Sequence, residues 1–168
     1  MLLFGIKIMK LGGKNLKNNF MASKKIHIIE DDADLLYGLE SEFTADNFEV
    51  ETSYGDEELE ELLDNMREFE PDYIILDLIL PKADGFELIK KIKEDDVLGL
   101  KPIFVFTDLS DEDSKGRSSE LGADYIFFKD EFDTYEFAAK VKKIIANQSK
   151  SHGFEDDSDE DEDESLID

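Results

Sequence analysis

The chain contains 168 residues with a formal net charge of −25, no cysteine and two histidines. This length accommodates one domain of ordinary size together with short end segments. Without cysteine the chain has no disulfides, thiol nucleophiles or cysteine-ligated metal centres, and two histidines rule out a multi-histidine metal site. The negative charge disfavours binding to nucleic acid and to anionic membrane surfaces.

The two ends of the chain differ in charge from each other. Residues 1–22 are interpreted as an N-terminal extension, because residues 1–20 hold four lysines and no acid. The apolar run precedes the lysines, the reverse of a secretory signal, so the alternatives are a weak amphipathic anchor and, as the favoured one, a simple extension. Residues 149–168 hold ten acids, which predicts a disordered acidic tail. Residues 23–148 are the expected domain.

Five short segments in this domain are predicted to be β-strands. Four are continuous apolar runs, typical of a parallel sheet buried on both faces, and the second segment alternates more weakly. Helical patterns separate the segments, and this alternation predicts an α/β fold with a doubly wound parallel sheet between two layers of helices. The expected strands are Lys25–Ile29, Phe48–Ser53, Tyr73–Leu76, Ile103–Phe106 and Tyr125–Phe128.

Apolar residues at helical spacing predict four amphipathic helices. They are Asp34–Phe43, Glu57–Phe69, a helix through Phe86, Ile89 and Ile92, and a last helix that carries Phe137, Val141 and Ile145. Asp133 and Glu136 have the spacing of a capping box at the start of the last helix. The segment Asp111–Gly122 has one large apolar residue, Leu121, and an internal Gly116. The fourth helix is therefore expected to be short and mobile.

Polar residues directly follow four of the predicted strands. Glu30 and Asp31 follow the first strand, and Asp77 follows the third. Thr107 follows the fourth strand and Lys129 the fifth. Because the carboxyl ends of parallel strands meet at one edge of the sheet, where ligands of open α/β sheets bind, these side chains are expected to lie together. Each has an ordinary explanation when taken singly, but their occurrence at successive strand ends favours a functional site.

The residue types at these strand ends indicate phosphoryl chemistry. Carboxylates about 5 Å apart repel one another by roughly 3 kcal/mol per pair and need a cation, and oxygen ligands suit Mg²⁺ or Mn²⁺. Asp77 can then act as a nucleophile toward a phosphoryl group, whose oxygens Lys129 and Thr107 would stabilise. Asp32 or Asp34 is interpreted as a helix N-cap. The two histidines are interpreted as structural or solvated rather than catalytic.

Four segments resemble the receiver domain of two-component response regulators, over residues 24–147. They are IHIIEDDADL, YIILDLILPKADGFELIKKIK, PIFVFTD and LGADYIFFKDEF. The most specific feature is the spacing Asp77-x-x-x-Pro81-x-x-Asp84-Gly85 after the third strand. The resemblance implies a flavodoxin-like (βα)5 three-layer sandwich with five parallel strands in the order 2-1-3-4-5.

The resemblance also implies the function of a stand-alone, chemotaxis-regulator-like response regulator. Asp77 would accept a phosphoryl group from a histidine kinase or a phosphotransfer protein, and a downstream protein effector would receive the signal in the cytoplasm. Thr107 and Lys129 would contact the phosphoryl group and relay the change. The domain would assist its own phosphorylation and dephosphorylation without being an enzyme for an external substrate. The implied ligands of Mg²⁺ or Mn²⁺ are Glu30, Asp31, Asp77 and the backbone carbonyl of Ile79.

The chain departs from the receiver pattern at three positions. Asp130 stands where proline commonly follows the lysine, and Ile126 stands at a switch position that is usually aromatic. Tyr125 and Phe127 are candidates for replacing that aromatic side chain. Asp108 stands where a small residue is usual, so it adds bulk and negative charge near an incoming phosphoryl group. We therefore expect slow phosphoryl transfer and, with apolar Ile79 shielding the phosphorylated residue, slow hydrolysis.

Three other functions are compatible with the sequence. The chain could be a phosphorylation-silent, receiver-like binding module in which these departures have removed the chemistry. The acidic tail could act as a decoy for basic proteins or a loose Ca²⁺ buffer, although EF-hand spacing is absent. A phosphatase or hydrolase acting on an external substrate would share the acid cluster. Only the acidic tail is expected after residue 148, with no effector domain, so the expected output is through a protein partner rather than DNA.

Overall fold

The computed structural model describes residues 23–151. The N-terminal extension expected over 1–22 and most of the expected acidic tail lie outside the described residues. Within residues 23–151, the helices lack the combination of length and apolarity that crossing a bilayer would demand.

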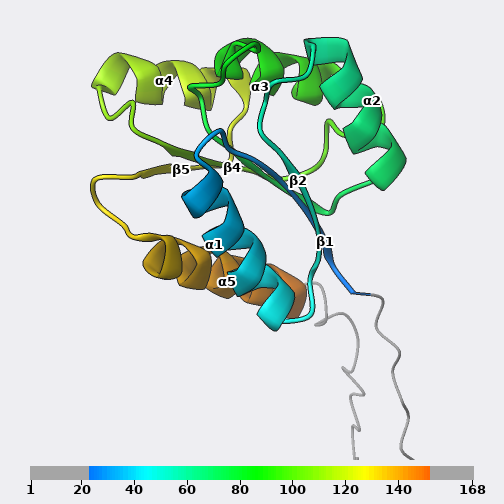
Figure 1. Ribbon diagram of the computed structural model, residues 1–168, viewed down its shortest axis with the longest axis vertical. Coiled ribbons are helices and arrows are strands. Elements are labelled where there is room, and N and C mark those ends of the chain that lie inside the picture. Colours follow the sequence, from blue (N-terminus) through cyan, green and yellow to red (C-terminus); the bar gives the residue numbers. More distant parts are fainter. Residues whose placement is uncertain (1–22, 152–168) are drawn as a thin grey trace, which may run out of the picture.

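Five parallel strands form one sheet at the centre of the molecule (Figure 1). Their order is β2-β1-β3-β4-β5, which confirms the predicted doubly wound topology. Two strand boundaries differ from the predicted ones by one residue, because β2 begins at Glu49 and β4 ends at Thr107. The strands are β1 (Lys25–Ile29), β2 (Glu49–Ser53), β3 (Tyr73–Leu76), β4 (Ile103–Thr107) and β5 (Tyr125–Phe128).

Helices cover both faces of the sheet and complete three layers. Figure 1 shows α1 and α5 together on one face and α2, α3 and α4 on the other. The helices are α1 (Ala33–Ala45), α2 (Leu59–Phe69), α3 (Gly85–Glu94), α4 (Glu112–Leu121) and α5 (Thr134–Ser151). The last helix therefore includes residues 149–151, where the sequence analysis begins the acidic tail.

Each face of the sheet has its own apolar core, because neighbouring residues of a strand point to opposite faces. Ile28 packs in the core under α1 and α5, and Ile29 packs in the core under α2 and α3. In the first core the ring of Phe106 stacks on that of Phe137 of α5, with centroids 4.0 Å apart. Burying one such side chain contributes about 1.5–3 kcal/mol, so the two cores hold the strand ends in a fixed relative position.

The fourth helix is among the shortest helices of the described residues. α4 spans ten residues, as many as α3 and fewer than α1, α2 and α5, in line with the predicted short helix. Ser118 is its one fully buried residue in this structure, and Asp111 caps its first turn by accepting a hydrogen bond from the Ser114 N–H. The Arg117 guanidinium lies 4.1 Å from the centroid of the Phe86 ring on α3. Capping and this contact compensate for the missing apolar face; the expected mobility stays a prediction.

The capping box of the last helix is confirmed. The Glu136 N–H donates to the Asp133 carboxylate at 2.8 Å, and the Asp133 N–H donates to the Glu136 carboxylate at 3.2 Å. These two bonds satisfy N–H groups that the start of a helix leaves without partners. The capping box therefore sets where α5 begins after the loop that follows β5.

His27 lies in the middle of β1 and is 1% exposed. Within the described part of the chain, neither ring nitrogen has a hydrogen-bond partner, and the ring meets Phe69 edge-on at 6.0 Å. Burial lowers the pKa of His27 from 6.5 to about 4. The imidazole is therefore neutral in the folded protein at neutral pH, consistent with a structural role.

We expect His27 to make the fold sensitive to acid. Between pH 6.5 and 4 the unfolded chain binds a proton at this residue and the folded chain does not. Stability should therefore fall by about 1.4 kcal/mol per pH unit across that window from this group alone, and the loss should stop below the folded-state pKa. The variant His27→Leu should lose this component when urea unfolding is measured at successive pH values.

The other histidine provides the matched control. His152→Gln should keep the acid sensitivity of the parent chain, because it leaves the buried His27 unchanged. Identical pH slopes for His27→Leu and the parent chain would contradict the assignment.

Candidate functional site

The side chains predicted to gather at the strand ends do so. Backbone hydrogen bonds extend the sheet by one residue: the Asp77 N–H donates to the Ile29 carbonyl at 3.0 Å, and the Lys129 N–H donates to the Thr107 carbonyl at 2.9 Å. The same sheet edge holds Glu30, whose N–H donates to the Ser53 carbonyl. These bonds fix the backbone of each polar residue before its side chain makes any contact.

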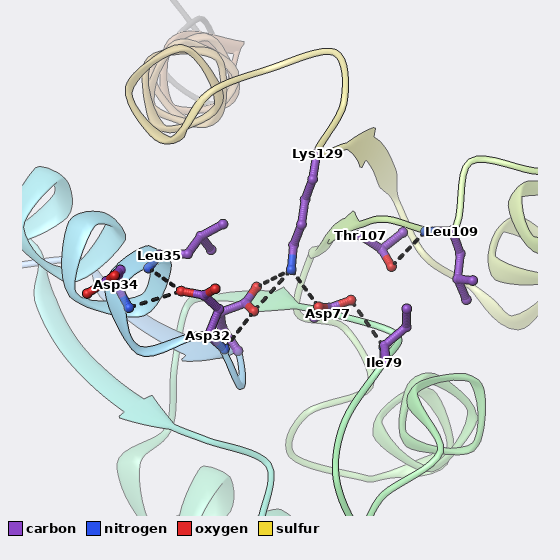
Figure 2. A network of polar contacts seen from close by, with 9 residues as sticks. Asp32, Asp34, Leu35, Asp77, Ile79, Thr107, Leu109 and Lys129 are labelled. Carbon is purple, nitrogen blue, oxygen red and sulfur yellow. Dashed lines mark hydrogen bonds and ion pairs between the residues drawn. The ribbon is translucent and has the colours of Figure 1, made fainter.

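A partly buried lysine joins two buried carboxylates at the centre of the site (Figure 2). The Lys129 ammonium donates to Asp77 Oδ2 at 2.6 Å and to Glu30 Oε1 at 3.0 Å. The side chains of Asp77 and Glu30 are 3% and 2% exposed, and that of Lys129 is 11% exposed. Removing one partner of such a group leaves a buried charge without compensation, which typically costs 3–5 kcal/mol.

The electrostatics of the group follow from this burial. Burial raises the pKa of Glu30 to about 7, with the hydrogen bond from Lys129 opposing the rise and the negative charge of Asp77 adding to it. Burial alone would lower the pKa of Lys129, but its hydrogen bonds to Asp77 and Glu30 outweigh that effect and raise the pKa above its usual value. The lysine therefore stays charged, and Glu30 is poised to take or release a proton near neutral pH.

Three acids at this edge could hold a metal ion. Carboxylate oxygens of Glu30, Asp31 and Asp77 all lie within 4.8 Å of one another, and Asp31 is exposed to solvent. This set of hard oxygen donors, without nitrogen or sulfur, fits Mg²⁺ or Mn²⁺. The Ile79 N–H donates to Asp77 Oδ1 at 3.1 Å, which places Ile79 beside the group, while the role of its carbonyl as a ligand stays a prediction.

Asp32 is the N-cap of α1, a role that the sequence assigned to either Asp32 or Asp34. Its carboxylate accepts hydrogen bonds from the N–H groups of Asp34 and Leu35, both at 3.0 Å, so Asp32 is the N-cap of α1. Its own N–H donates to Glu30 Oε1 at 3.1 Å (Figure 2). One residue therefore both starts the helix and orients the buried carboxylate.

Thr107 lies at the end of β4 and is fully buried. Its hydroxyl accepts a hydrogen bond from the Leu109 N–H at 3.3 Å (Figure 2). Such a bond stabilises the turn after β4, which is an ordinary structural role for a threonine. The position next to β3 is the predicted one, because β3 and β4 are neighbours in the sheet. Contact between Thr107 and a phosphoryl group stays a prediction.

The suggestion that Tyr125 or Phe127 replaces the missing aromatic switch is wrong. Ile126 packs against the core on the side of α3 and α4, whereas Tyr125 and Phe127 pack against the opposite core. Tyr125 stacks on Phe104, with centroids 4.8 Å apart. Alternation along a strand makes this unavoidable, because residues one position away from Ile126 must face the other side of the sheet.

An open cleft of about 610 Å³ leads to the carboxylate of Asp77. Asp108 lines this cleft, as the sequence led us to expect, and Leu35 lines it too, which sequence reasoning missed. Leu35 falls within the predicted amphipathic helix Asp34–Phe43, and nothing in its spacing distinguishes a residue at the mouth of a cleft. Ile79 is 47% exposed at the same opening.

Gly85 holds the loop after Asp77 in place. A Cβ atom at this residue would lie 2.4 Å from the Leu78 Cα and 2.6 Å from the Leu78 carbonyl oxygen. Such distances require the backbone to shift, so the first residue of α3 must be glycine for the loop to pass this close. The sequence places Asp84 and Gly85 in the motif spacing after the third strand but does not show this close approach, because it involves a residue seven positions earlier.

Comparison with known proteins places these features in one family. Residues 26–142 match the family described as response regulator receiver domain. The response regulator ArlR of Staphylococcus aureus is 35% identical over 125 residues, which are 74% of this chain and 53% of that protein. The chain therefore spans about half the length of the curated relatives it matches.

Solved structures agree with this match. A putative response regulator from Chloroflexus aurantiacus is 28% identical, with a TM-score of 0.63 over 74% of this chain and 98% of that one. The BeF3-activated DrrB receiver domain is 27% identical, with a TM-score of 0.61 and the same coverage of both chains.

Two glycine-to-alanine substitutions in helices test the close contact between Gly85 and the backbone at Leu78. Gly85→Ala should lower the free energy of unfolding by about 1–3 kcal/mol, because the added methyl group forces the backbone at Leu78 to move. Gly116→Ala in α4 is the control: its Cβ would meet nothing within 4 Å, so alanine should stabilise by about 0.5–1 kcal/mol. Urea unfolding of both variants measures the difference, and effects of the same sign would refute the close-contact argument.

Proposed function

The chain belongs to the response regulator receiver domain family, and from this premise we propose that Asp77 accepts a phosphoryl group from a histidine kinase or a phosphotransfer protein. The observation that carries the proposal is the buried group formed by Lys129, Asp77 and Glu30. Two of its members, Asp77 and Lys129, line an open cleft that a donor could enter. The domain is then a regulatory phosphoacceptor rather than an enzyme for an external substrate.

The proposed transfer is a displacement at phosphorus. A carboxylate oxygen of Asp77 forms a bond to the phosphorus atom, the bond from phosphorus to the donor nitrogen breaks, and its electron pair stays on the imidazole. The product is an acyl phosphate on Asp77. Lys129 already donates to Asp77 Oδ2, so its ammonium is placed to neutralise charge on the transferred oxygens. The Ile79 N–H orients the other carboxylate oxygen.

Glu30, Asp31 and Asp77 would hold Mg²⁺ or Mn²⁺, with the backbone carbonyl of Ile79 as a further ligand. The ion would supply electrostatic stabilisation of the negative charge that phosphoryl transfer brings to this edge. The burial of Glu30 and Asp77 supports this assignment, because their charges are incompletely balanced by one lysine. The backbone N–H of Asp32, the N-cap of α1, donates to Glu30 Oε1 and so keeps this carboxylate oriented.

The signal would pass to a downstream protein effector, and we place the reaction in the cytoplasm. Phosphorylation adds a charge of about −1.5 to −2, and Thr107 and Lys129 are the residues placed to respond to it. With Ile126 rather than an aromatic residue packed beside α4, the response would involve α4 and β5 without an aromatic rotamer change. The alternative of a phosphorylation-silent binding module rests on this same departure, and a labelling experiment separates the two.

We predict that the chain is labelled at Asp77 by a small phosphodonor such as phosphoramidate. Labelling should require Mg²⁺ or Mn²⁺, be stable in acid and labile in alkali, and be lost entirely in Asp77→Asn. Mass spectrometry of the intact protein and its peptides locates the modification. Asp130→Asn is the matched control, because Asp130 is exposed beside Lys129 and lies outside the buried group. Unlabelled parent protein would favour the silent module.

We also predict that Asp108 slows the reaction through its charge. Asp108→Asn and Asp108→Ala should both raise the rate of labelling by about two- to fivefold at low salt, because one negative charge leaves the mouth of the cleft. The asparagine variant keeps the size of the side chain, so it separates charge from bulk. The gain should shrink at high salt, where screening reduces the repulsion in the parent chain. Unchanged rates in both variants would rule out this role for Asp108.

A further inference from the structure

A second open groove lies at the other end of the sheet from Asp77. It has a volume of about 750 Å³ and is bordered by the start of β3, the loop between α3 and β4 and the end of α5. We call it the amino-end groove; its apolar wall consists of Tyr73, Val97, Leu100 and Pro102. Lys24 and Ser149 line its edge. The proposed phosphoryl transfer uses none of these residues.

The groove exposes apolar surface that the fold holds outward. Leu100 is 96% exposed and Val97 is 46% exposed, while Leu98 between them is fully buried. The Asp95 carboxylate accepts hydrogen bonds from the N–H groups of Val97 and Leu98, and the Lys101 N–H donates to the Leu98 carbonyl. The loop is thus anchored by Leu98 and by backbone bonds on both sides, so Leu100 cannot turn inward without breaking them.

Both ends of the described chain meet at this groove. The Lys24 ammonium donates to the Ser149 hydroxyl and lies 5.7 Å from the centroid of the Tyr73 ring. Residues 1–22 therefore join the domain at the edge of the groove, and the residues after 151 leave from the last turn of the helix beside it. Figure 1 shows β1 and the end of α5 at this same end of the molecule.

The first nine residues of the chain are apolar enough to bind the apolar wall of this groove. Residues 1–9 read MLLFGIKIM, in which seven of nine residues are apolar. Residues 10–22 connect them to the domain and could span about 40 Å if extended, which is ample for a return to the groove. A tether of this length keeps the segment at about millimolar local concentration, so even a weak apolar contact would be occupied.

We propose that the apolar segment Met1–Met9 docks in the amino-end groove against Val97 and Leu100. The acidic run at 155–164 begins four residues after the last described residue, but it consists of nine acids and one serine and offers no apolar side chain to this wall. It instead complements the N-terminal lysines, which docking brings to the end of the molecule from which the acidic run leaves. The N-terminal segment is therefore a built-in ligand of the domain rather than an appendage without a binding site.

Paired cysteines test this proposal directly, because the natural chain contains none. In the full chain, Leu3→Cys is combined with Leu100→Cys, and as a control with Tyr37→Cys on α1, which is 73% exposed. Oxidation at micromolar protein should close the first pair within one molecule at least ten times faster than the control pair. Both groove and control positions are exposed, so neither substitution threatens the fold.

A second cysteine pair and a hydrogen-exchange comparison complete the test. Leu100→Cys combined with Phe154→Cys tests the C-terminal residues as the occupant, and non-reducing gels separate closure within one chain from a disulfide between two copies. Hydrogen exchange at residues 96–101 should be slower in the full chain than in a chain that lacks residues 1–20. Equal closure of the first pair and its Tyr37 control, faster closure to residue 154, dimers as the main product, or unchanged exchange would each overturn the proposal. Phosphorylation at Asp77 is independent of all these outcomes.

Discussion

The arrangement of this protein depends on two like charges held together inside it. Glu30 and Asp77 are buried at adjacent strand ends, and the Lys129 ammonium bonds to both. Such a group is costly to assemble, since each charge loses its hydration and the carboxylates repel each other. It is tolerated because two apolar cores and the hydrogen bonds of the sheet fix the three backbones independently of the charges. The unbalanced negative charge that remains is what makes a divalent cation a fitting ligand.

Two local features, the N-cap of α1 and a glycine at the start of α3, orient the carboxylates of this group. Asp32 caps α1 and orients Glu30 with a single backbone N–H, so the start of the helix and the position of the carboxylate are set together. Gly85 lets the loop after Asp77 lie against the start of α3, which fixes where the Ile79 N–H meets the carboxylate. Each of these two residues connects an element of the fold to the site, although neither is expected to touch a bound ligand.

The two ends of the sheet have divided roles. The carboxyl ends of the strands carry nearly all the polar groups of the site, because the strands are parallel and their ends meet there. The amino ends carry a groove with an apolar wall, beside both ends of the described part of the chain. Apolar surface at that end would interfere little with phosphoryl chemistry at the other, since the length of the sheet separates them. A ligand at one end therefore leaves the other free to react.

The sequence by itself determined the order of strands and helices, the two-sided burial of the sheet and the identity of the residues at the strand ends. These features are local or periodic: apolar runs such as Tyr73–Leu76, and polar residues that follow them directly. The close approach of Gly85 to Leu78 and the positions of Leu35 at the cleft and Leu100 at the amino-end groove were decided only by tertiary structure. Each depends on which surface a neighbouring element covers, and contacts between residues far apart in the chain leave no periodic trace in the sequence.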